Sequence, residues 1–351
     1  MPSTFSDPYA AAAFGVGAVA LSLTALLVGL IVALRLRMQR VRRQEQAFTA
    51  RWRPVLLDAL SHDTVPQLPR LARRDQINFL TLWVYLQESL RGSANTRLNV
   101  LARQLDFDET AARLARTGRR AQRLLGILTL GHLRNPAAWD ALALQSASAD
   151  AMISLYAAQA LTRLDPPRAT ALLLQSLVGR EDWSLLQVAA LLADARSDFG
   201  LRLDTTLTRL DPLLWQRALQ LADALRLSLP LQVLLHILHH SPSAETLIAA
   251  LRLAADPALL PAVRGFLPHD QWRVRVEAVR FLSRFGDAGD VPLLEHLLQD
   301  EQWWVRYEAG RALLQMPFYG SASLLALERS TGDRRASVMV GHVLAEPRAT
   351  A

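Results

Sequence analysis

The residues best suited to bind a metal ion are three histidines in the segment LLHILHH, namely His236, His239 and His240. His236 and His240 are four residues apart, so on a helix they would share one face and could hold a single ion. The nearest carboxylate is that of Glu245, beyond Pro242. Two imidazoles alone make a weak metal site, and histidines at the end or on the surface of a helix explain the same pattern.

No catalytic motif accompanies these histidines. The sequence has no Gly-rich phosphate loop, no Gly-x-Ser-x-Gly nucleophile motif and no His-Glu-x-x-His zinc motif. It also has no Cys, which excludes disulfides, thiolate zinc sites and a thiol nucleophile. We therefore expect a binding protein that is not an enzyme and that needs no cofactor.

Tryptophans and arginines are the other chemically distinctive residues. Trp272, Trp303 and Trp304 lie among arginines, and Trp with Arg is the composition of protein-binding hot spots. The alternative is that the three indoles pack between neighbouring helices, and at each single site this alternative is favoured. The arginines concerned are Arg275, Arg280, Arg306 and Arg311.

Internal repeats would position these residues. The segment QWRVRVEA at 271–278 recurs as QWWVRYEA at 302–309, an offset of 31 residues that fits one helix–turn–helix unit. Four residues after each repeated position stands another apolar residue, mostly Leu, which predicts closely packed helices. We expect an all-α solenoid of about seven helix pairs over 119–320. The repeated position, with steps of 29 to 31 residues, is occupied by Ala309, Ala278, Ala249, Ala218, Val188, Ala157 and Gly126.

Each expected pair consists of a long amphipathic helix and a shorter apolar one. Residues 274–285 carry apolar side chains at helical spacing, and Gly286 supplies a natural end. The shorter helices, such as 291–298 and 169–177, follow Asp or Pro. Because a solenoid needs atypical end units, we expect helical caps at 54–118 and 321–351.

The two sharpest repeats resemble the HEAT-repeat family and, within it, the PBS-lyase-like bacterial branch. The resemblance rests on a turn Asp followed by Val-Arg-x-Glu-Ala, here Asp270 with 274–278 and Asp300 with 305–309. It implies a solenoid in which the second helix of each pair lines the concave surface. It also implies that Arg275 and Arg306 bond the turn Asp residues along the stack. It implies no catalytic role.

On the expected concave surface, a set of exposed polar side chains is the predicted partner-binding site. Such a set of both charges suits a polar interface, and its arginines are the groups that an anionic ligand would use. The set consists of Glu277, Arg280, Arg284, Glu308, Arg311 and Gln315.

The N-terminal segment predicts one transmembrane helix. Residues 10–34 contain no charged residue and would form about 37 Å of helix, enough to cross a bilayer with some tilt. A cleaved signal peptide would have a basic region before a shorter apolar core and an Ala-x-Ala exit after it, and residues 10–34 are flanked by neither.

Basic residues follow this apolar segment. Residues 35–53 hold seven Arg and one Glu, a net charge of +6 within a chain total of +7. The positive-inside rule therefore places residues 1–9 outside and the repeats in the cytoplasm. Because the rest of the chain is nearly neutral, we expect no nucleic-acid binding. Anionic lipid head groups are the expected partners of Arg35, Arg37, Arg40, Arg42 and Arg43.

All 39 basic residues are Arg, which together with abundant Ala and Leu indicates a bacterial source. We predict a single-pass inner-membrane scaffold that binds a protein partner and holds it at the membrane, as in an envelope polysaccharide or secretion complex. The alternative is a sensor that binds a small anionic ligand, such as a nucleotide, on its arginine-bearing face. The predicted parts are 1–9 outside, the span 10–34, the basic segment 35–53, the cap 54–118, the repeats 119–320 and the C-terminal cap and tail 321–351.

Overall fold

The computed structural model describes residues 8–61, 71–72, 75–90, 92–241 and 243–346. Within these ranges all regular structure is helical, as the periodicity predicted. The chain forms two compact units, Met1–Ala141 and Leu142–Ala351, whose boundary falls inside α6 (Trp139–Ser146). The predicted domain boundaries stay predictions, and residues 1–7 of the predicted outer segment lie outside the described ranges. The side chains of 8–20, 40–42, 44–45, 57, 59–61 and 93 are also not described.

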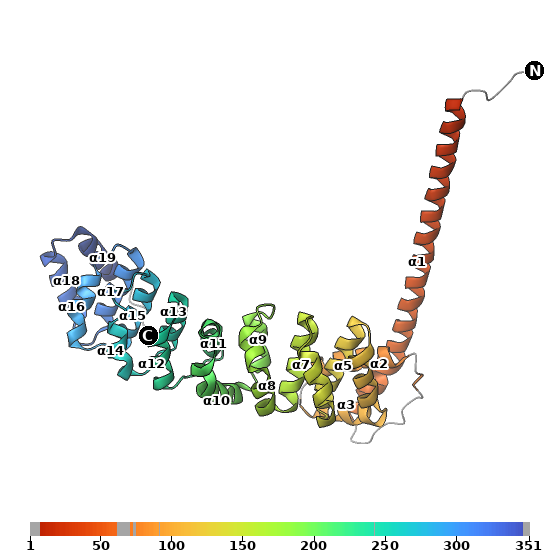
Figure 1. The fold of residues 1–351 in the computed structure, drawn as a ribbon, viewed down its shortest axis with the longest axis horizontal. Coiled ribbons are helices and arrows are strands. Elements are labelled where there is room, and N and C mark those ends of the chain that lie inside the picture. Colours follow the sequence, from red (N-terminus) through yellow and green to blue (C-terminus); the bar gives the residue numbers. More distant parts are fainter. Residues whose placement is uncertain (1–7, 62–70, 73–74, 91, 242, 347–351) are drawn as a thin grey trace, which may run out of the picture. The chain divides into compact units, whose positions relative to one another are not determined.

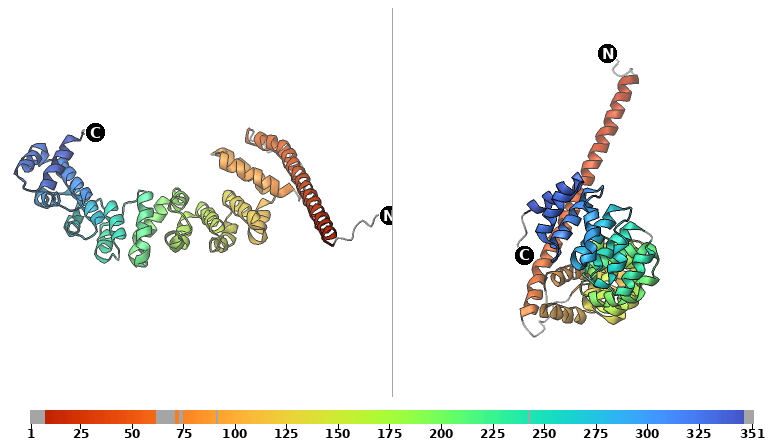
Figure 2. Two further views of the ribbon diagram at one scale, coloured as in Figure 1. Left: turned by 90° about the horizontal axis from the view of Figure 1, so that it is seen from above. Right: turned by 90° about the vertical axis from the view of Figure 1, so that its left-hand side faces the viewer.

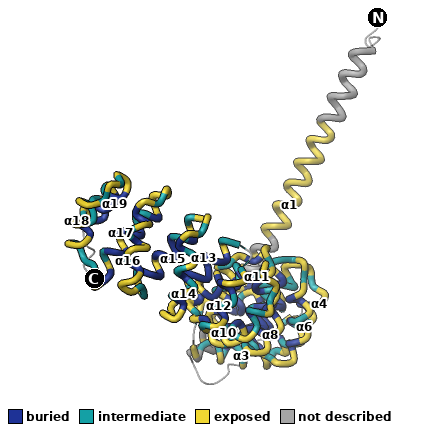
Figure 3. Tube along the Cα trace, turned by 60° about the vertical axis from the view of Figure 1, so that its left-hand side comes forward, coloured by how far each residue is buried: buried dark blue, intermediate teal, exposed yellow. Residues whose placement is uncertain are grey.

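The longest element is α1 (Pro8–Ser61), a single continuous helix (Figure 2). Among the described residues, its segment Leu21–Gln39 is long and apolar enough to cross a membrane, judged by length and composition. This segment overlaps the predicted span 10–34, and its described side chains are exposed (Figure 3). The segment is thus not buried in the described structure, and a signal sequence would meet the same length and composition criterion.

The C-terminal part of α1 belongs to the hydrophobic core of the first unit. Phe48, Trp52 and Leu56 recur every four residues, so they lie on one face of the helix, and all three are buried. The Trp52 ring packs edge-on against Phe79 at 5.1 Å, and Phe79 stacks on Phe107 at 4.9 Å. The helices that complete this unit are α2 (Gln76–Ser89), α3 (Ser93–Gln104), α4 (Phe107–Thr117) and α5 (Arg120–Leu133).

Gly126, the most N-terminal of the predicted repeated positions, allows α4 and α5 to lie in close contact. A Cβ at this position would lie 2.6 Å from both the Ala111 carbonyl oxygen and the Ala115 nitrogen. No side chain fits there without separating the two helices. The small residue that the periodicity singled out therefore has a packing reason.

The second unit is a stack of helix pairs in two layers (Figure 1). In the odd-numbered layer, α15 packs on α13 and α17, and α11 packs on α9 and α13. The odd-numbered helices are α7 (Ala151–Leu164), α9 (Leu185–Leu192), α11 (Pro212–Ala224), α13 (Ala244–Leu253), α15 (Trp272–Phe285), α17 (Trp303–Gln315) and α19 (Arg334–Ala345).

The even-numbered helices form the second layer, where α8 covers α7, α14 covers α15 and α16 covers α17. They are α8 (Pro166–Gly179), α10 (Arg196–Thr206), α12 (Leu231–His240), α14 (Leu260–Arg264), α16 (Val291–Leu297) and α18 (Gly320–Ser330). Short 3-10 turns stand at Pro136–Ala138 (η2), Leu207–Arg209 (η3), Pro257–Leu259 (η4) and Ala288–Asp290 (η5).

The repeated small positions lie where neighbouring odd-numbered helices meet. Ala157, Ala218, Ala278 and Ala309 are completely buried. The larger residue one turn later is equally buried at Leu161, Leu192, Leu282 and Leu313. The predicted solenoid of helix pairs with a period near 30 residues is confirmed.

Asp290 immediately precedes α16, but its side chain does not cap this helix. Asp287 caps the short turn η5 instead, because its Oδ1 accepts a hydrogen bond from the Gly289 nitrogen at 2.8 Å. Asp290 is completely buried, and its Oδ1 accepts a hydrogen bond from Arg264 Nε at 2.6 Å. A buried carboxylate needs such a partner, so Asp290 joins two repeats rather than starting a helix.

Candidate functional site

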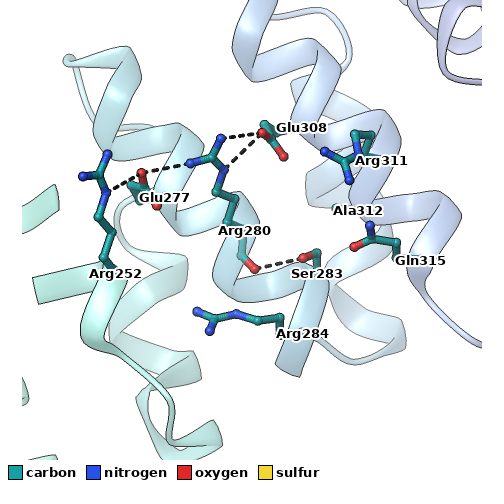
Figure 4. A pocket seen from close by; sticks show the side chains of 9 residues that line it. All are labelled: Arg252, Glu277, Arg280, Ser283, Arg284, Glu308, Arg311, Ala312 and Gln315. Carbon is teal, nitrogen blue, oxygen red and sulfur yellow. Dashed lines mark hydrogen bonds and ion pairs between the residues drawn. The ribbon is translucent and has the colours of Figure 1, made fainter. Parts of the chain in front are cut away.

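An open cavity of about 490 Å³ is lined by side chains of α13, α15 and α17 (Figure 4). The side chains come from successive turns of these helices, so three repeats build it together. Its lining residues are Arg252, Glu277, Arg280, Ser283, Arg284, Glu308, Arg311, Ala312 and Gln315. These include all six residues of the predicted partner-binding set.

A chain of ion pairs crosses the floor of this cavity from α13 to α17 (Figure 4). Glu277 Oε1 accepts from Arg252 Nε at 3.0 Å and from Arg280 Nη1 at 3.2 Å. Glu308 Oε1 accepts from Arg280 Nη2 at 2.7 Å and from Arg280 Nε at 3.1 Å. The hydrogen bond to Glu308 raises the pKa of Arg280 above its ordinary value.

Glu277 and Glu308 differ from the prediction that they would be exposed, since only 6 % and 8 % of their surfaces are accessible. The reason is the ion-pair chain, which draws each carboxylate against an arginine of the neighbouring repeat. Each of these carboxylates is therefore already paired with an arginine. The two glutamates therefore join repeats, and the exposed arginines are left to face solvent.

Arg284 and Arg311 form no ion pair with any described carboxylate. Arg284 Nη2 donates to the Ala254 carbonyl oxygen at 3.1 Å, and its guanidinium lies 5.2 Å from the Phe285 ring. The Arg311 guanidinium lies 5.7 Å from the Tyr307 ring. With four arginines and two glutamates lining it, the cavity has a formal charge of +2. The excess positive charge is located at Arg284 and Arg311.

A second cavity, of about 450 Å³, adjoins the first and shares Arg252, Glu277 and Arg280 with it. Trp272 and Trp304 line this second cavity. We call the two cavities together the interaction groove, with an arginine end at Arg284, Arg311 and Gln315 and a tryptophan end at Trp272 and Trp304. The other residues of the tryptophan end are Glu245, Ile248, Arg273 and Val276.

The tryptophans at repeat turns are in unequal environments. Trp303 and Trp304 have 41 % and 52 % of their surfaces exposed. Trp303 stacks on Tyr307 at 5.0 Å, and its ring lies 5.8 Å from His342 of α19. Trp303 thus packs against the next helix of the layer, whereas Trp304 is exposed and lines the groove.

The predicted bonds from arginine to turn aspartate occur at one of the two repeats. Arg275 Nη2 donates to Asp300 Oδ1 at 2.8 Å, which joins one turn to the next. Arg306 instead donates to the carbonyl oxygens of Asp300 and Glu301. Arg275 donates to the Asp270 carbonyl oxygen as well, so the carboxylate of Asp270 is not its acceptor.

The histidines of α12 stay weak metal candidates. The His236 and His240 rings stack at 4.5 Å, and the Trp215 ring lies 5.7 Å from His236. Within the described ranges, no three His, Cys, Asp or Glu side chains come together as metal ligands. Glu245, the carboxylate nearest in sequence, pairs with Arg273 at 3.5 Å.

The arginines predicted to meet lipid head groups lie on α1. Arg35, Arg37 and Arg43 are exposed. The side chains of Arg40 and Arg42 lie outside the described residues. Head-group binding by these arginines stays a prediction.

Sequence reasoning missed Arg252, Arg273 and Glu245 as groove residues. Arg252 comes three residues after the repeated position Ala249, whereas Arg280 comes two residues after Ala278. The two arginines therefore do not occupy equivalent positions in their repeats, and equivalence to Arg280 does not identify Arg252. Both positions lie within one helical turn of the repeated residue, and that wider window would have included Arg252.

The family described as HEAT repeats matches residues 231–314. This stretch runs from α12 almost to the end of α17 and contains every groove residue except Gln315. The match supports a HEAT-repeat protein, and HEAT repeats suggest a protein-interaction scaffold. No curated protein matches the chain.

Proposed function

We propose that this protein is a scaffold anchored in the bacterial inner membrane, whose cytoplasmic repeats hold a protein partner at the membrane. The HEAT repeats support the scaffold part of the proposal. Repeat stacks present extended surfaces built from many repeats, and the groove is such a surface. An envelope polysaccharide or secretion complex is the kind of assembly that needs a component held in this way.

The continuity of α1 is the observation that carries the anchoring part. The apolar segment Leu21–Gln39 and the buried face of Phe48, Trp52 and Leu56 belong to one helix. About 21 Å of helix separates Leu34 from Phe48 at about 1.5 Å per residue. Exposed arginines occupy this length, where lipid head groups would lie.

A continuous helix has a consequence for binding. A flexible linker would let the first unit move away from the membrane, whereas a helix that enters the core of that unit holds it near the surface. Confinement near the membrane raises the effective concentration of a membrane-bound partner. The scaffold therefore favours partners that are themselves at the membrane.

The anchor is tested on the full-length protein expressed in a bacterium. We expect it to stay in carbonate-washed membranes, to keep its N-terminal residues by intact mass, and to show cytoplasmic activity of a reporter fused after Ala351. The L26R/L30R variant places two charges in the span and should shift the protein to the soluble fraction. Its control is L186R/L213R, which changes two exposed leucines of the second unit. A mass lacking the apolar segment would refute the anchor, and a periplasmic reporter would refute the cytoplasmic placement of the repeats.

The scaffold part is tested by crosslinking in cells from one defined position. A photo-crosslinking amino acid at Gln315, in the groove, should capture one membrane-associated protein. The same amino acid at the exposed Arg202 of α10 should not capture it. Capture from both positions, or from neither, would contradict the proposed binding face.

A further inference from the structure

The interaction groove combines two chemically different ends on the same three helices. Its tryptophan end offers two indoles, and its arginine end carries the excess positive charge. Between the ends, Arg252 and Arg280 are held by Glu277 and Glu308. A ligand would therefore meet an apolar wall, a neutralised middle and a cationic end in that order.

We propose that the groove binds a short acidic segment of the protein partner in an extended conformation. One apolar side chain of the segment lies against Trp272 and Trp304, and carboxylates lie against Arg284 and Arg311. This inference rests on the proposed scaffold function and specifies the chemistry of the partner.

The charges of the groove favour an acidic occupant. The carboxylates of Glu277 and Glu308 already accept hydrogen bonds from Arg252 and Arg280, so they do not compete for Arg284 or Arg311. Among the described residues, Arg284 uses one Nη2 bond to a carbonyl oxygen, and Arg311 contacts the Tyr307 ring, so both keep donors for a ligand. Arginine donors arranged in this way match a carboxylate in geometry as well as in charge.

The tryptophan end supplies the apolar contact. Trp304 is half exposed although it lines a cavity, and Ile248 and Val276 lie in the same lining. An indole with open area beside aliphatic side chains is the composition of a binding hot spot. Arg273 and Glu245 pair with each other there, so they add no net charge.

The length of the segment follows from helix geometry. Trp272 and Arg284 are separated by about 18 Å along α15, and Trp304 and Arg311 by about 10 Å along α17, at about 1.5 Å per residue. An extended chain covers about 3.3 Å per residue. The apolar residue and the acidic residues of the partner should therefore be about three to five positions apart.

The test begins with a phage-displayed library of random peptides of about twelve residues, selected on full-length protein in lipid nanodiscs. We expect enriched peptides to contain Asp or Glu at about three to five positions from an aromatic or aliphatic residue. The dissociation constant of the enriched peptide is then measured by fluorescence polarisation. It should rise with salt, because ion pairs in an open groove are screened.

Matched variants locate the peptide in the groove. R284Q/R311Q should raise the dissociation constant about tenfold, and R202Q should leave it unchanged, since Arg202 is exposed on α10. W304A should weaken binding about tenfold or more, whereas W303A, a tryptophan outside both cavities, should have a minor effect. Circular dichroism of each variant shows that it keeps its helical fold.

The remaining outcomes separate this inference from the scaffold proposal. Enriched peptides without acidic residues, or peptides indifferent to R284Q/R311Q, would overturn the inference and leave the scaffold intact. So would an empty selection together with partner capture at Gln315, because the partner would then bind through a folded surface. An empty selection without capture at Gln315 would overturn both.

Discussion

The late repeats, α13 to α17, and the early ones, α7 to α11, join neighbouring repeats with different acceptors. In the late repeats, Arg280 bridges two carboxylates, those of Glu277 and Glu308. In the early repeats, Arg180 donates to the Ser148 carbonyl oxygen, and Arg217 donates to that of Trp183. Arginines thus join neighbouring repeats in both regions. In the late repeats the acceptor is a glutamate side chain, which can be recognised in the sequence, whereas in the early repeats it is a backbone carbonyl oxygen.

The residues on the groove side of the odd-numbered helices also differ between the late and the early repeats. Relative to Ala278, the positions one before and two after are Glu277 and Arg280. Relative to Val188, the same positions are Gln187 and Ala190. The packing positions are common to all repeats, whereas the charged groove is confined to the last three odd-numbered helices that the HEAT match covers.

The largest expected difference between the two regions is at their turn tryptophans. Trp183 is completely buried, and its Nε1 donates to Ser154 Oγ at 3.2 Å, whereas Trp304 is 52 % exposed. W183A should lower the free energy of unfolding by about 3–5 kcal/mol, because it leaves a cavity. W304A should lower it by less than about 1 kcal/mol.

Hydrogen exchange of the full-length protein in nanodiscs measures both changes by region. In a repeat stack, loss of one contact weakens mainly the neighbouring repeats. W183A should therefore lower protection in α7 and α9 and leave α15 unchanged. Equal losses for W183A and W304A would show that the late tryptophans are also structural, and would weaken the case for the tryptophan end of the groove.

A smaller effect is expected from changing one side chain of an arginine bridge in each region. E308Q should lower the free energy of unfolding by about 1–3 kcal/mol, because Arg280 loses a charged acceptor in a partly buried place. R217Q should cost about 1 kcal/mol, because only bonds to carbonyl oxygens are lost. Urea unfolding followed by circular dichroism compares the two variants.

A double-mutant cycle refines this second comparison. If the carboxylate bridge is specific, E308Q should cost little once Arg280 has been changed to Gln. An undiminished cost in the double mutant would mean that Glu308 stabilises α17 by some other contact. The bonds of Arg180 to Ser148 and of Arg217 to Trp183 allow no equivalent cycle, since their acceptors are backbone carbonyl oxygens.

The sequence predicted the solenoid because its period is a packing requirement. Ala278 must be small and Leu282 must be large for α15 to pack between its neighbouring helices. The same pair of positions therefore recurs in the other repeats. The same logic placed Gly126 correctly, although its neighbours lie in the first compact unit.

The candidate site was only partly predictable. The burial of Glu277 and Glu308 depends on which arginine of another repeat reaches them, and residue spacing within one helix does not encode that. The bond predicted from Arg306 to a turn aspartate side chain does not form for a similar reason, since Arg306 donates to two carbonyl oxygens of its own turn. The repeats could be predicted from the sequence alone. The contacts between repeats could be identified only from the three-dimensional structure.

The last comparison concerns two turn aspartates, Asp182 and Asp300. The hydrogen bond from Arg180 is the main reason why the pKa of Asp182 lies below its ordinary value of 3.8. A lowered pKa in the folded protein means that this interaction stabilises the fold above that value, and that its contribution disappears as the pH falls through the folded pKa. Because Asp182 is exposed, D182N should change stability only slightly at pH 7, less in high salt, and not at all in strong acid.

Asp300 provides the matched comparison in the late region. Its side chain is 10 % exposed and accepts bonds from Arg275 at 2.8 Å and from the Gln302 nitrogen at 2.8 Å. D300N should cost about 1–2 kcal/mol at pH 7, because it removes a charged acceptor that both holds the turn before α17 and joins two repeats. Thermal unfolding at neutral and acidic pH, with and without salt, compares the two variants. A D182N cost as large as that of D300N would show that the early turns depend on a carboxylate after all, and the distinction between the two regions would then be lost.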